Sequence, residues 1–186
     1  MGGETRAPRP GGAASAAPDA VRFREAGPGD AAALLALKQG LDRETSFMMF
    51  EPDERAETEA DVAAQLGRAT DEANSVVIVA ETAGGLVGYV DAGGGRLRRS
   101  RLAAQVVIGV LATASGSGVG SGLLRELESW ARGHGLHRLE LTVMAHNRRA
   151  LALYERMGFV VEGRRREGLL VNGDFIDELY MAKLLG

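Results

Sequence analysis

The sequence predicts an α+β domain in which a mixed β-sheet is flanked by helices. Short runs rich in Val and Ile alternate with apolar patterns of helical period, and three such runs follow one another in the middle of the chain. An Asn-Gly pair near the C-terminus is typical of a hairpin turn between two more strands. A length of 186 residues suits one such domain. The predicted order of strands and helices is β-α-α-β-β-β-α-β-α-β-β.

The first third of the chain predicts a strand followed by two helices. Apolar and charged residues alternate over 21–26, as in a half-buried strand. Asp30 is placed to cap the Ala- and Leu-rich helix that follows, which we expect to end near Gly40. The segment 41–55 has no clear period and predicts an ordered loop or short helical turns. A second helix is expected over 58–67.

The middle of the chain predicts three strands, a long helix and a fourth strand. The runs 75–81, 85–92 and 103–110 are rich in Val and Ile. After a glycine-rich segment comes a helix whose apolar face is formed by Leu123, Leu124, Leu127, Trp130 and Ala131. A further strand is expected over 137–143.

The C-terminal part predicts a capped helix and a hairpin. Asn147 is expected to cap a helix whose buried face is Ala150, Leu153, Tyr154 and Met157. Gly158 stands at the C′ position, where a left-handed residue ends a helix. The pair Asn172-Gly173 then predicts a tight turn between two strands.

The composition excludes several classes of protein. The formal net charge is −3 and the pI about 5.7, so no global charge favours nucleic acid or an anionic membrane surface. The absence of cysteine excludes disulfides, a thiol nucleophile and cysteine-ligated zinc, and no apolar run is long enough to span a bilayer. Residues 1–20, rich in Gly, Ala and Pro, predict a disordered tail ahead of a domain over 21–186. We therefore expect a cytoplasmic protein.

The segment SGSGVGSG, residues 115–122, has a glycine at every second position. It lies between a Val- and Ile-rich strand and an amphipathic helix, whose first amides have no internal acceptor. Glycines let such amides approach an anion closely, so the segment predicts a phosphate site, with a flexible connector as the alternative. A Walker loop would need a lysine, the pattern G-x-G-x-x-G does not fit, and no serine has the glycines of a hydrolase elbow.

Two stretches, in this order, resemble the diagnostic motifs of the GNAT acetyltransferases. Residues 107–131 resemble motif A, whose pattern is Gln/Arg-x-x-Gly-x-Gly/Ala, although Ser115 stands at the Gln/Arg position. Residues 139–159 resemble the second motif, a strand and then Asn-x-x-Ala-x-x-Leu-Tyr with a Gly-Phe pair, at Asn147, Ala150, Leu153, Tyr154, Gly158 and Phe159. The order of elements over 21–185 also fits. The resemblance implies a seven-stranded, mostly antiparallel sheet that is splayed between its fourth and fifth strands.

The resemblance further implies that the protein binds acetyl-CoA as its acyl donor. The pyrophosphate would be received by the backbone amides of Ser115, Gly116, Ser117, Gly118, Val119, Gly120 and Ser121. The strand end from Val110 to Ala112 would pair with the pantetheine arm as an added strand does, and an ordinary edge strand is the alternative. Because backbone amides hold the pyrophosphate, we expect Ser115 to weaken or rearrange coenzyme contacts without abolishing binding.

Two residues of the second motif receive roles by the same resemblance. Tyr154 would face the coenzyme sulfur and protonate the leaving thiolate. A phenol has a pKa of ~10 and a thiol of ~8.5, so this transfer is modestly uphill unless the site adjusts both. The spacing alone indicates a core tyrosine. Asn147 could hydrogen-bond the pantetheine, cap its helix, or do both.

The group that takes a proton from the acceptor amine is less clearly marked. Some relatives carry a carboxylate where this chain has Gln105, which cannot act as a base. Glu140 on the next strand is a candidate catalytic residue, although it could instead pair with an arginine, and His146 or a chain of waters are alternatives. His134, His137 and His146 lack the spacing of a metal site, so we expect no metal.

The loop over 44–54 combines apolar side chains with acids and, by the resemblance, helps to line the acceptor site. The candidate walls are Phe47, Met48, Met49 and Phe50, and the acids that could attract a cationic amine are Glu44 and Asp42. An apolar plug over the core is the alternative interpretation of this loop.

These features predict acetyl transfer from acetyl-CoA to a primary amine of a small molecule or a protein, by direct attack in a ternary complex. No covalent enzyme intermediate is expected, because the chain has neither a cysteine nor a serine elbow. Two other classes stay open: a non-catalytic regulator that binds acyl-CoA without turnover, and a structural domain that does not bind it. We expect no nucleic-acid or membrane partner, and a homodimer is left open.

Overall fold

A computed structural model of the chain describes residues 20–186, so the tail predicted over 1–20 lies outside the described residues except for Ala20. The elements of the described part are β1 (Arg22–Glu25), α1 (Ala31–Glu44), α2 (Glu59–Asp71), β2 (Val76–Thr82), β3 (Gly85–Gly94), β4 (Ala103–Val110), α3 (Val119–Gly133), β5 (Arg138–Met144), α4 (Arg148–Arg156), β6 (Val160–Val171) and β7 (Asp174–Leu184). Short 3₁₀ turns precede α1 and follow β4. The order of elements is the predicted one.

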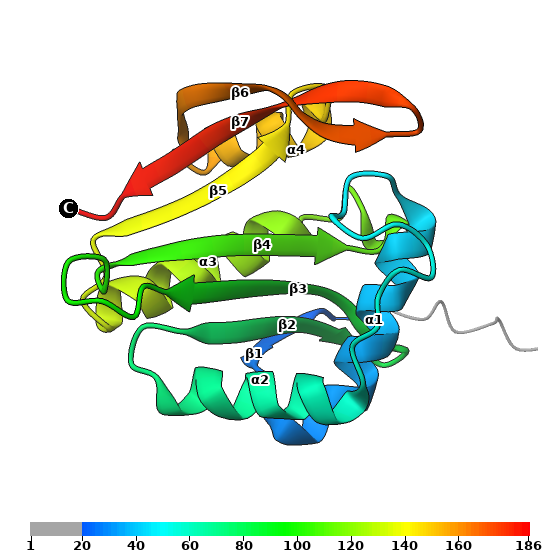
Figure 1. Cartoon of the computed structure of the whole chain (residues 1–186). Coiled ribbons are helices and arrows are strands. Elements are labelled where there is room, and N and C mark those ends of the chain that lie inside the picture. The colour runs from blue at the N-terminus through cyan, green and yellow to red at the C-terminus, as the bar shows by residue number, and fades with distance from the viewer. Residues whose placement is uncertain (1–19) are drawn as a thin grey trace, which may run out of the picture.

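One seven-stranded sheet runs through the described part of the chain, in the order β1-β2-β3-β4-β5-β7-β6 (Figure 1). Every neighbouring pair is antiparallel except β4 and β5, which are parallel. The long β6–β7 hairpin turns at Asn172 and Gly173, whose φ angles of 53° and 88° suit the tight turn predicted for this pair. The sheet is therefore mixed and mostly antiparallel, as predicted.

The sheet opens between its two parallel strands. Only residues 103–105 of β4 pair with residues 138–140 of β5, and beyond this point the strands diverge (Figure 1). The remaining part of β4, up to Val110, keeps its pairing with β3 but has no neighbour on the other side. This confirms the predicted splay and leaves unpaired main-chain groups of β4 along a gap in the sheet.

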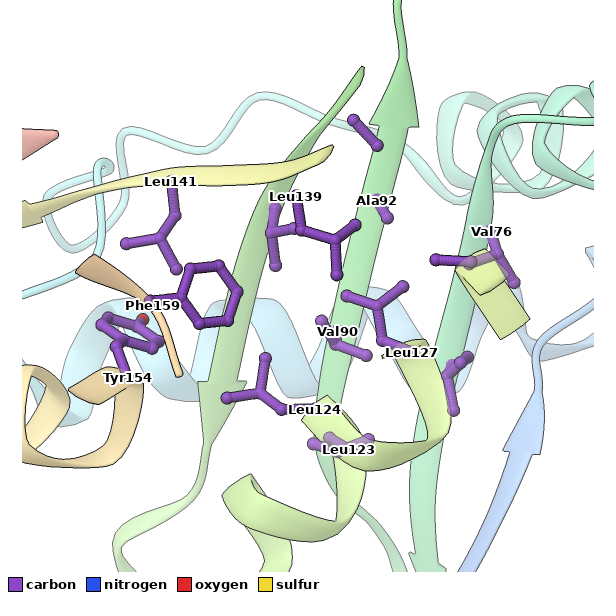
Figure 2. Packing of buried hydrophobic residues seen from close by; sticks show 14 of the residues in the cluster. Val76, Val90, Ala92, Leu123, Leu124, Leu127, Leu139, Leu141, Tyr154 and Phe159 are labelled. Atoms are coloured by element: carbon purple, nitrogen blue, oxygen red, sulfur yellow. The ribbon is translucent and has the colours of Figure 1, made fainter. Parts of the chain in front are cut away.

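Helices cover the two faces of the sheet unequally. On one face α3 and α4 pack over a core that spans the sheet, in which Leu123, Leu124 and Leu127 meet strand residues such as Val90 and Leu139 (Figure 2). On the other face α1 and α2 enclose a second core over the N-terminal strands. In Figure 1 the C-terminal strands carry no helix on this second face. The gap between β4 and β5 therefore lies at the border of the covered region.

The first helix differs from its prediction at both ends. It continues past Gly40 to Glu44, because Leu41 is buried and extends the apolar side formed by Leu34 and Leu37. One glycine inside a helix costs only about 1 kcal/mol, which this burial offsets. Asp30 stands at the N-terminus, but its carboxylate accepts hydrogen bonds from the Gly27 amide and from Arg24 and makes no cap bond to α1.

The helix α4 is held at both ends as predicted. Asn147 Oδ1 accepts a hydrogen bond from the Ala150 amide at 3.1 Å. At the other end Gly158 has a φ of 85°, and the amides of Gly158 and Phe159 bond back to carbonyls of the last turn. These two bonds form a Schellman motif, which fixes a helix of only nine residues beside the gap in the sheet.

Candidate active site

A cleft of about 600 Å³ occupies the gap in the sheet. Its floor is the end of the paired part of β4, at Gln105, the free residues 106–110 of β4, and the facing end of β5, residues 142–144. At one end lie the glycine-rich turn of residues 115–122, which we call the glycine turn, and the inner side of α4. At the other end lie the C-terminus of α1, part of the 44–54 loop and Glu178 of β7. One continuous cavity therefore joins the predicted coenzyme and acceptor regions.

The glycine turn presents a row of main-chain donors. Within residues 20–186 the amides of residues 116–121 have no hydrogen-bond acceptor, and Gly122 is the first whose amide bonds within the helix start, to the Gly118 carbonyl. Gly116 and Gly118 have φ angles of 86° and 89°, with Ser117 between them on the ordinary side. Alternation of this kind turns successive amides toward one point, which makes an anion-binding concavity at a helix N-terminus.

Glycine is required at the four positions of the turn for two different physical reasons. Gly116 and Gly118 are needed for their left-handed backbone. Gly120 and Gly122 lie where a neighbour comes close: a Cβ on Gly120 would be 3.0 Å from Leu153 Cδ2, and one on Gly122 would overlap the Phe23 ring. The alternation thus joins a shaped turn to a tightly packed first helical turn.

Ser115 differs from its prediction as an amide donor. Its amide already donates to the Ala112 carbonyl at 3.1 Å, within the 3₁₀ turn Ala112–Ala114 that follows β4. The Ser117 hydroxyl likewise donates to the Ala114 carbonyl. The predicted phosphate donors therefore reduce to the amides from Gly116 onward, and neither serine side chain adds a positive charge.

The strand end predicted to meet the pantetheine lies in the cleft. Val110 and Ala112 both line it, and β4 is unpaired on this side. The Ala112 amide, however, donates to Glu44 Oε2 at 2.9 Å. Glu44 was predicted to attract a cationic acceptor, and in the structure its carboxylate holds the chain just after β4 while also lining the cleft.

Tyr154 reaches the cleft from the inner side of α4. Its ring is buried in the core beside Phe159, with 5.9 Å between the ring centroids (Figure 2). Burial raises the pKa of the Tyr154 hydroxyl to about 12. The ring therefore belongs to the core, as the spacing alone indicated, and the residue also lines the cleft. Asn147, the N-cap residue of α4, also lines the cleft and keeps its side-chain nitrogen available beside the cap bond.

The 44–54 loop forms part of the acceptor end. Phe47, Met48 and Met49 line the cleft, and the Phe47 ring lies 5.2 Å from the ring of His146, which is outside the lining. Met48 is half-buried against the core under α1 and α2, whereas Phe47 is exposed. Phe50 lies outside the cleft, under the Arg55 guanidinium at 4.3 Å. The loop is thus a wall of the cleft that is anchored through one methionine.

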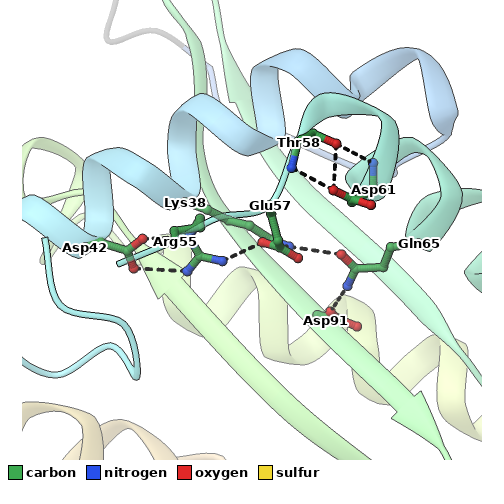
Figure 3. Close-up of polar contacts among 8 residues, drawn as sticks. All are labelled: Lys38, Asp42, Arg55, Glu57, Thr58, Asp61, Gln65 and Asp91. Atoms are coloured by element: carbon green, nitrogen blue, oxygen red, sulfur yellow. Dashed lines mark hydrogen bonds and ion pairs between the residues drawn. The ribbon is translucent and has the colours of Figure 1, made fainter. Parts of the chain in front are cut away.

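A buried ion pair fastens the end of this loop to α1. Asp42 accepts hydrogen bonds from Arg55 Nε at 2.6 Å and Nη2 at 3.0 Å, and both side chains are more than nine-tenths buried (Figure 3). Arg55 also donates to Glu57 at 2.6 Å. Asp42 was predicted as an acid for the acceptor amine, but it is consumed by this pair and does not line the cleft.

The polar network continues across α2 to the sheet. Lys38, which is buried, donates to Gln65 Oε1 at 3.0 Å, and Gln65 Nε2 donates to Asp91 at 2.6 Å (Figure 3). Burial raises the pKa of Asp91. The predicted acceptor side of the molecule therefore rests on buried polar and charged side chains that are hydrogen-bonded to one another.

Two carboxylates that bear on the acceptor end lie in different places. Glu140 is outside the cleft, 39% exposed at its side chain and bonded to Arg138 Nε at 2.7 Å, which is the pairing weighed against a catalytic role. Glu178 was not singled out from the sequence, yet it lines the cleft and is 4% exposed. It accepts a hydrogen bond from Arg165 at 3.0 Å. Its inward position follows from its register opposite Met144, which a single strand pattern does not reveal.

Over residues 20–186, the His, Asp and Glu side chains form no group of three that could hold a metal ion. Nor is any helix of this part long and apolar enough to cross a membrane.

The splayed sheet, the amide-rich turn and the buried tyrosine together define an acyl-transferase type of fold and cleft, and the comparisons identify the family. Residues 39–159, more than half of the chain, match the Acetyltransferase (GNAT) family. The protein therefore belongs to the GNAT acetyltransferases, which confirms the resemblance drawn from its motifs.

Solved structures and one curated relative agree with this assignment. A GNAT-family acetyltransferase from Streptococcus pneumoniae superposes with a TM-score of 0.86 at 32% identity, over 90% of this chain and all of that one. The structure of yncA from Salmonella typhimurium, with its cofactor acetyl-CoA, gives a TM-score of 0.79 at 23% identity, over 90% and 95% of the two chains. The L-amino acid N-acetyltransferase AaaT of Escherichia coli is 38% identical over 71 residues, which span 36% of this chain and 42% of that protein.

Proposed function

We propose that this protein transfers the acetyl group of acetyl-CoA to a primary amine, by direct attack within a ternary complex. The observation that carries the proposal is the cleft itself. Four residues whose main-chain amides have no acceptor among the described residues, an unpaired strand edge and a buried tyrosine all border one cavity in the gap of the sheet; the four are Gly116, Gly118, Gly120 and Ser121. A structural domain that used the glycines only as a turn would need none of these three together.

The cleft suits coenzyme A at each of its chemical parts. The amides of residues 116–121 suit the pyrophosphate, because they combine free donors with the positive end of the α3 dipole. The free edge of β4 can bond the amide groups of the pantetheine arm as a neighbouring strand would. That the similar fold of yncA was solved with acetyl-CoA supports this placement.

When bound, acetyl-CoA supplies the activated acetyl group as a thioester, and the residues of this chain position it and manage protons. The unpaired edge of β4 orients the arm so that the thioester lies between the strands. Tyr154 holds a proton at its hydroxyl, which it donates to the departing sulfur. A pKa of about 12 keeps this phenol protonated at neutral pH, the form that a general acid needs, but it also makes the phenol a weaker acid, so the transfer to the sulfur is further uphill than from an exposed tyrosine.

The acceptor enters from the end of the cleft lined by the 44–54 loop. Phe47, Met48 and Met49 offer apolar surface, and Glu178 offers a carboxylate that can meet an ammonium group. Glu178 also pairs with Arg165 at 3.0 Å, but unlike Asp42 and Glu140 it lines the cleft. Such a site suits a small amine with an apolar body. The match to an L-amino acid N-acetyltransferase makes free amino acids the first acceptors to test, ahead of polyamines and peptide N-termini.

The carboxylate that serves the amine can be identified by a pair of substitutions. Because Glu178 lines the cleft and Glu140 does not, Glu178→Gln should raise the acceptor KM or lower kcat at least several-fold, while Glu140→Gln should change both by less than about twofold. A large loss in Glu140→Gln alone would instead assign the base to Glu140, and full activity in both would favour His146 or a water chain.

The proposed activity is tested by incubating the protein with acetyl-CoA and panels of amines, and by following the free thiol that is released. We expect thiol release that depends on the amine and an acetylated product of the expected mass. Coenzyme binding in calorimetry with no turnover on any panel would favour the regulatory module, and no binding would favour the structural domain. A cytoplasmic location is part of the same proposal, since the acetyl donor is a cytosolic metabolite.

A further inference from the structure

We propose that Arg149 of α4 binds the coenzyme pyrophosphate from the side opposite the amides of the glycine turn. This proposal rests on the proposed function, since it concerns the same coenzyme. It begins from a missing charge: residues 115–122 carry no basic side chain, and Ser115 and Ser117 are engaged with neighbouring carbonyls. The amides alone would face a doubly negative group with no formal positive charge.

The geometry of α4 brings an arginine to this turn. Arg149, Leu153 and Arg156 follow one another at helical spacing along one side of the helix, and all three line the cleft. A Cβ on Gly120 would lie 3.0 Å from Leu153 Cδ2, and a Cβ on Gly116 would lie 3.9 Å from Arg149 Nη2. This side of α4 therefore covers the glycine turn, and the guanidinium of Arg149 stands beside the first left-handed glycine.

Arg149 is also free to take a ligand. Among residues 20–186, no carboxylate lies within 4.0 Å of its guanidinium and none of its nitrogens donates a hydrogen bond. Arg156 also lines the cleft and makes no ion pair among the described residues, but Arg149 is the one of the two whose guanidinium lies beside the glycine turn. The unpaired Arg149 guanidinium thus lies beside the amides of residues 116–121, which have no acceptor among the described residues. Hydrogen-bond donors gather at this place without an acceptor for them.

The chemistry of the guanidinium suits a pyrophosphate. Its planar donors can bond two phosphate oxygens at once, and charge-assisted bonds of this kind are stronger than those of neutral donors. The position beside Gly116 places it on the group that the amides hold, whereas the 3′-phosphate of coenzyme A is farther along the molecule. We therefore assign Arg149 to the pyrophosphate and treat the 3′-phosphate as an outcome of the test.

The test compares Arg149→Ala with Arg148→Ala, the neighbouring arginine that is exposed and does not line the cleft. Calorimetry with acetyl-CoA should show Arg149→Ala binding about tenfold more weakly, the lower part of the range for bonds to charged groups because the side chain is exposed. Arg148→Ala should change the affinity by less than about twofold, and Arg149→Lys should recover part of the loss. Thermal unfolding checks that each variant is folded.

Three donors locate the contact. With acetyl-dephospho-CoA, which lacks the 3′-phosphate, the factor between wild type and Arg149→Ala should be unchanged. With S-acetylpantetheine, which has no pyrophosphate, the factor in KM should fall to about one. Equal affinity of Arg149→Ala and wild type for acetyl-CoA, or a factor that vanishes with the dephospho donor or persists with the pantetheine donor, overturns the assignment. If wild type itself fails to bind acetyl-CoA, the proposed function fails as well, so the two failures are distinguishable.

Discussion

The two ends of the cleft are built from different chemistry. At the coenzyme end the donors are main-chain amides of residues 116–121, shaped by two left-handed glycines. At the acceptor end the lining comes from side chains of α1, the 44–54 loop and β7, and the loop is anchored by the buried Asp42–Arg55 pair. A site made of backbone is specified by which residues are small enough to allow it. A site made of side chains is specified by which charged and polar side chains pair with one another in the folded chain.

This difference has a functional consequence. Main-chain amides can hold an anion whatever side chains surround them, so under the proposed function we expect the coenzyme end to tolerate changes of side chain. The wall formed by Phe47, Met48 and Met49 can change without touching the amides, so acceptor preference can vary independently. Tyr154 lines the cleft from the core side, and under the proposed function it serves both substrates.

The largest effect is expected from Tyr154→Phe. The ring keeps its packing beside Phe159 and only the hydroxyl is lost, so the fold and coenzyme affinity should be preserved. General acid catalysis is worth roughly 10²–10⁴-fold, and the loss should appear in kcat. Tyr180→Phe, an exposed tyrosine on β7, is the matched control and should be neutral. Equal kcat for Tyr154→Phe and wild type, where chemistry limits the rate, would make the tyrosine a core residue only.

The pH dependence sharpens the same test. Burial raises the pKa of Tyr154 to about 12, so the protonated phenol persists to higher pH than in an exposed tyrosine. The ratio of wild-type to Tyr154→Phe kcat should therefore stay constant from pH 7 to about pH 10, because the phenol loses its proton only as the pH approaches 12. A ratio that falls between pH 8 and pH 9 would show a phenol with a lowered pKa in the working complex.

The next effect falls on the anchor of the acceptor side. Asp42→Asn removes one charge of a buried pair and leaves the Arg55 guanidinium buried, which is expected to cost about 3 kcal/mol of unfolding free energy. Urea denaturation measures this loss, and Glu140→Gln, which breaks a half-exposed pair, should cost less than about 1 kcal/mol. In the folded variant the acceptor KM should rise while coenzyme affinity stays constant. A parallel loss of coenzyme affinity would show that the two ends are not independent.

A smaller but more localised effect is expected at the coenzyme end, from Gly118→Val. Gly118 has a φ of 89°, so any other residue would strain the turn. No atom lies within 4 Å of where its Cβ would be, so the valine side chain would occupy the open space in which we propose that the phosphates bind. Acetyl-CoA binding should weaken well over tenfold. Gly135→Val is the matched control: it has a φ of 70° and equally open space, but lies at the other end of α3.

Both glycine variants should lose similar stability in thermal unfolding, and only Gly118→Val should lose coenzyme affinity in calorimetry. Equal affinity of Gly118→Val and wild type would remove the phosphate from the glycine turn. A loss of affinity in both variants would point to a general effect of strain on α3.

The contrast between the two ends also explains what could be predicted from the sequence. Left-handed backbone and close approach demand particular residue types, above all glycine. The glycine turn, the caps of α4 and the Asn172-Gly173 hairpin could therefore be predicted from the sequence, and so could the family. The order of elements followed from periodicity. The predicted end of α1 near Gly40 is wrong, because Leu41 continues the buried apolar side of the helix and one glycine does not end it.

The acceptor end was predicted less well, for a physical reason. The predicted acids Glu44 and Asp42 turned out to bond the Ala112 amide and Arg55, partners far away in sequence. Glu178 enters the cleft only because its register with β5 turns it inward. Arg149 left a weak signal, its spacing of four residues from Leu153, but its nearness to Gly116 depends on how α4 lies against α3. Tertiary pairing of side chains has no local signature.

The smallest change in rate, and the most selective, is expected from Phe47→Ala with Met48→Ala. Both side chains line the acceptor end, and neither contacts the amides of the glycine turn, so acetyl-CoA affinity should change by less than about twofold. Losing apolar wall should lower kcat/KM for acceptors with large apolar bodies by several-fold, since burial of each methylene is worth about 0.8 kcal/mol, and should spare small ones. The ranking of acceptors in the amine panel is the measurement, and Leu97→Ala with Leu102→Ala, exposed and remote from the cleft, is the control.

Met48 also packs on the core under α1 and α2, so thermal unfolding has to separate the loss of stability from the loss of the acceptor wall. If coenzyme affinity collapses while the acceptor ranking does not move, the 44–54 loop is a plug over the core, and the separation of donor and acceptor ends fails.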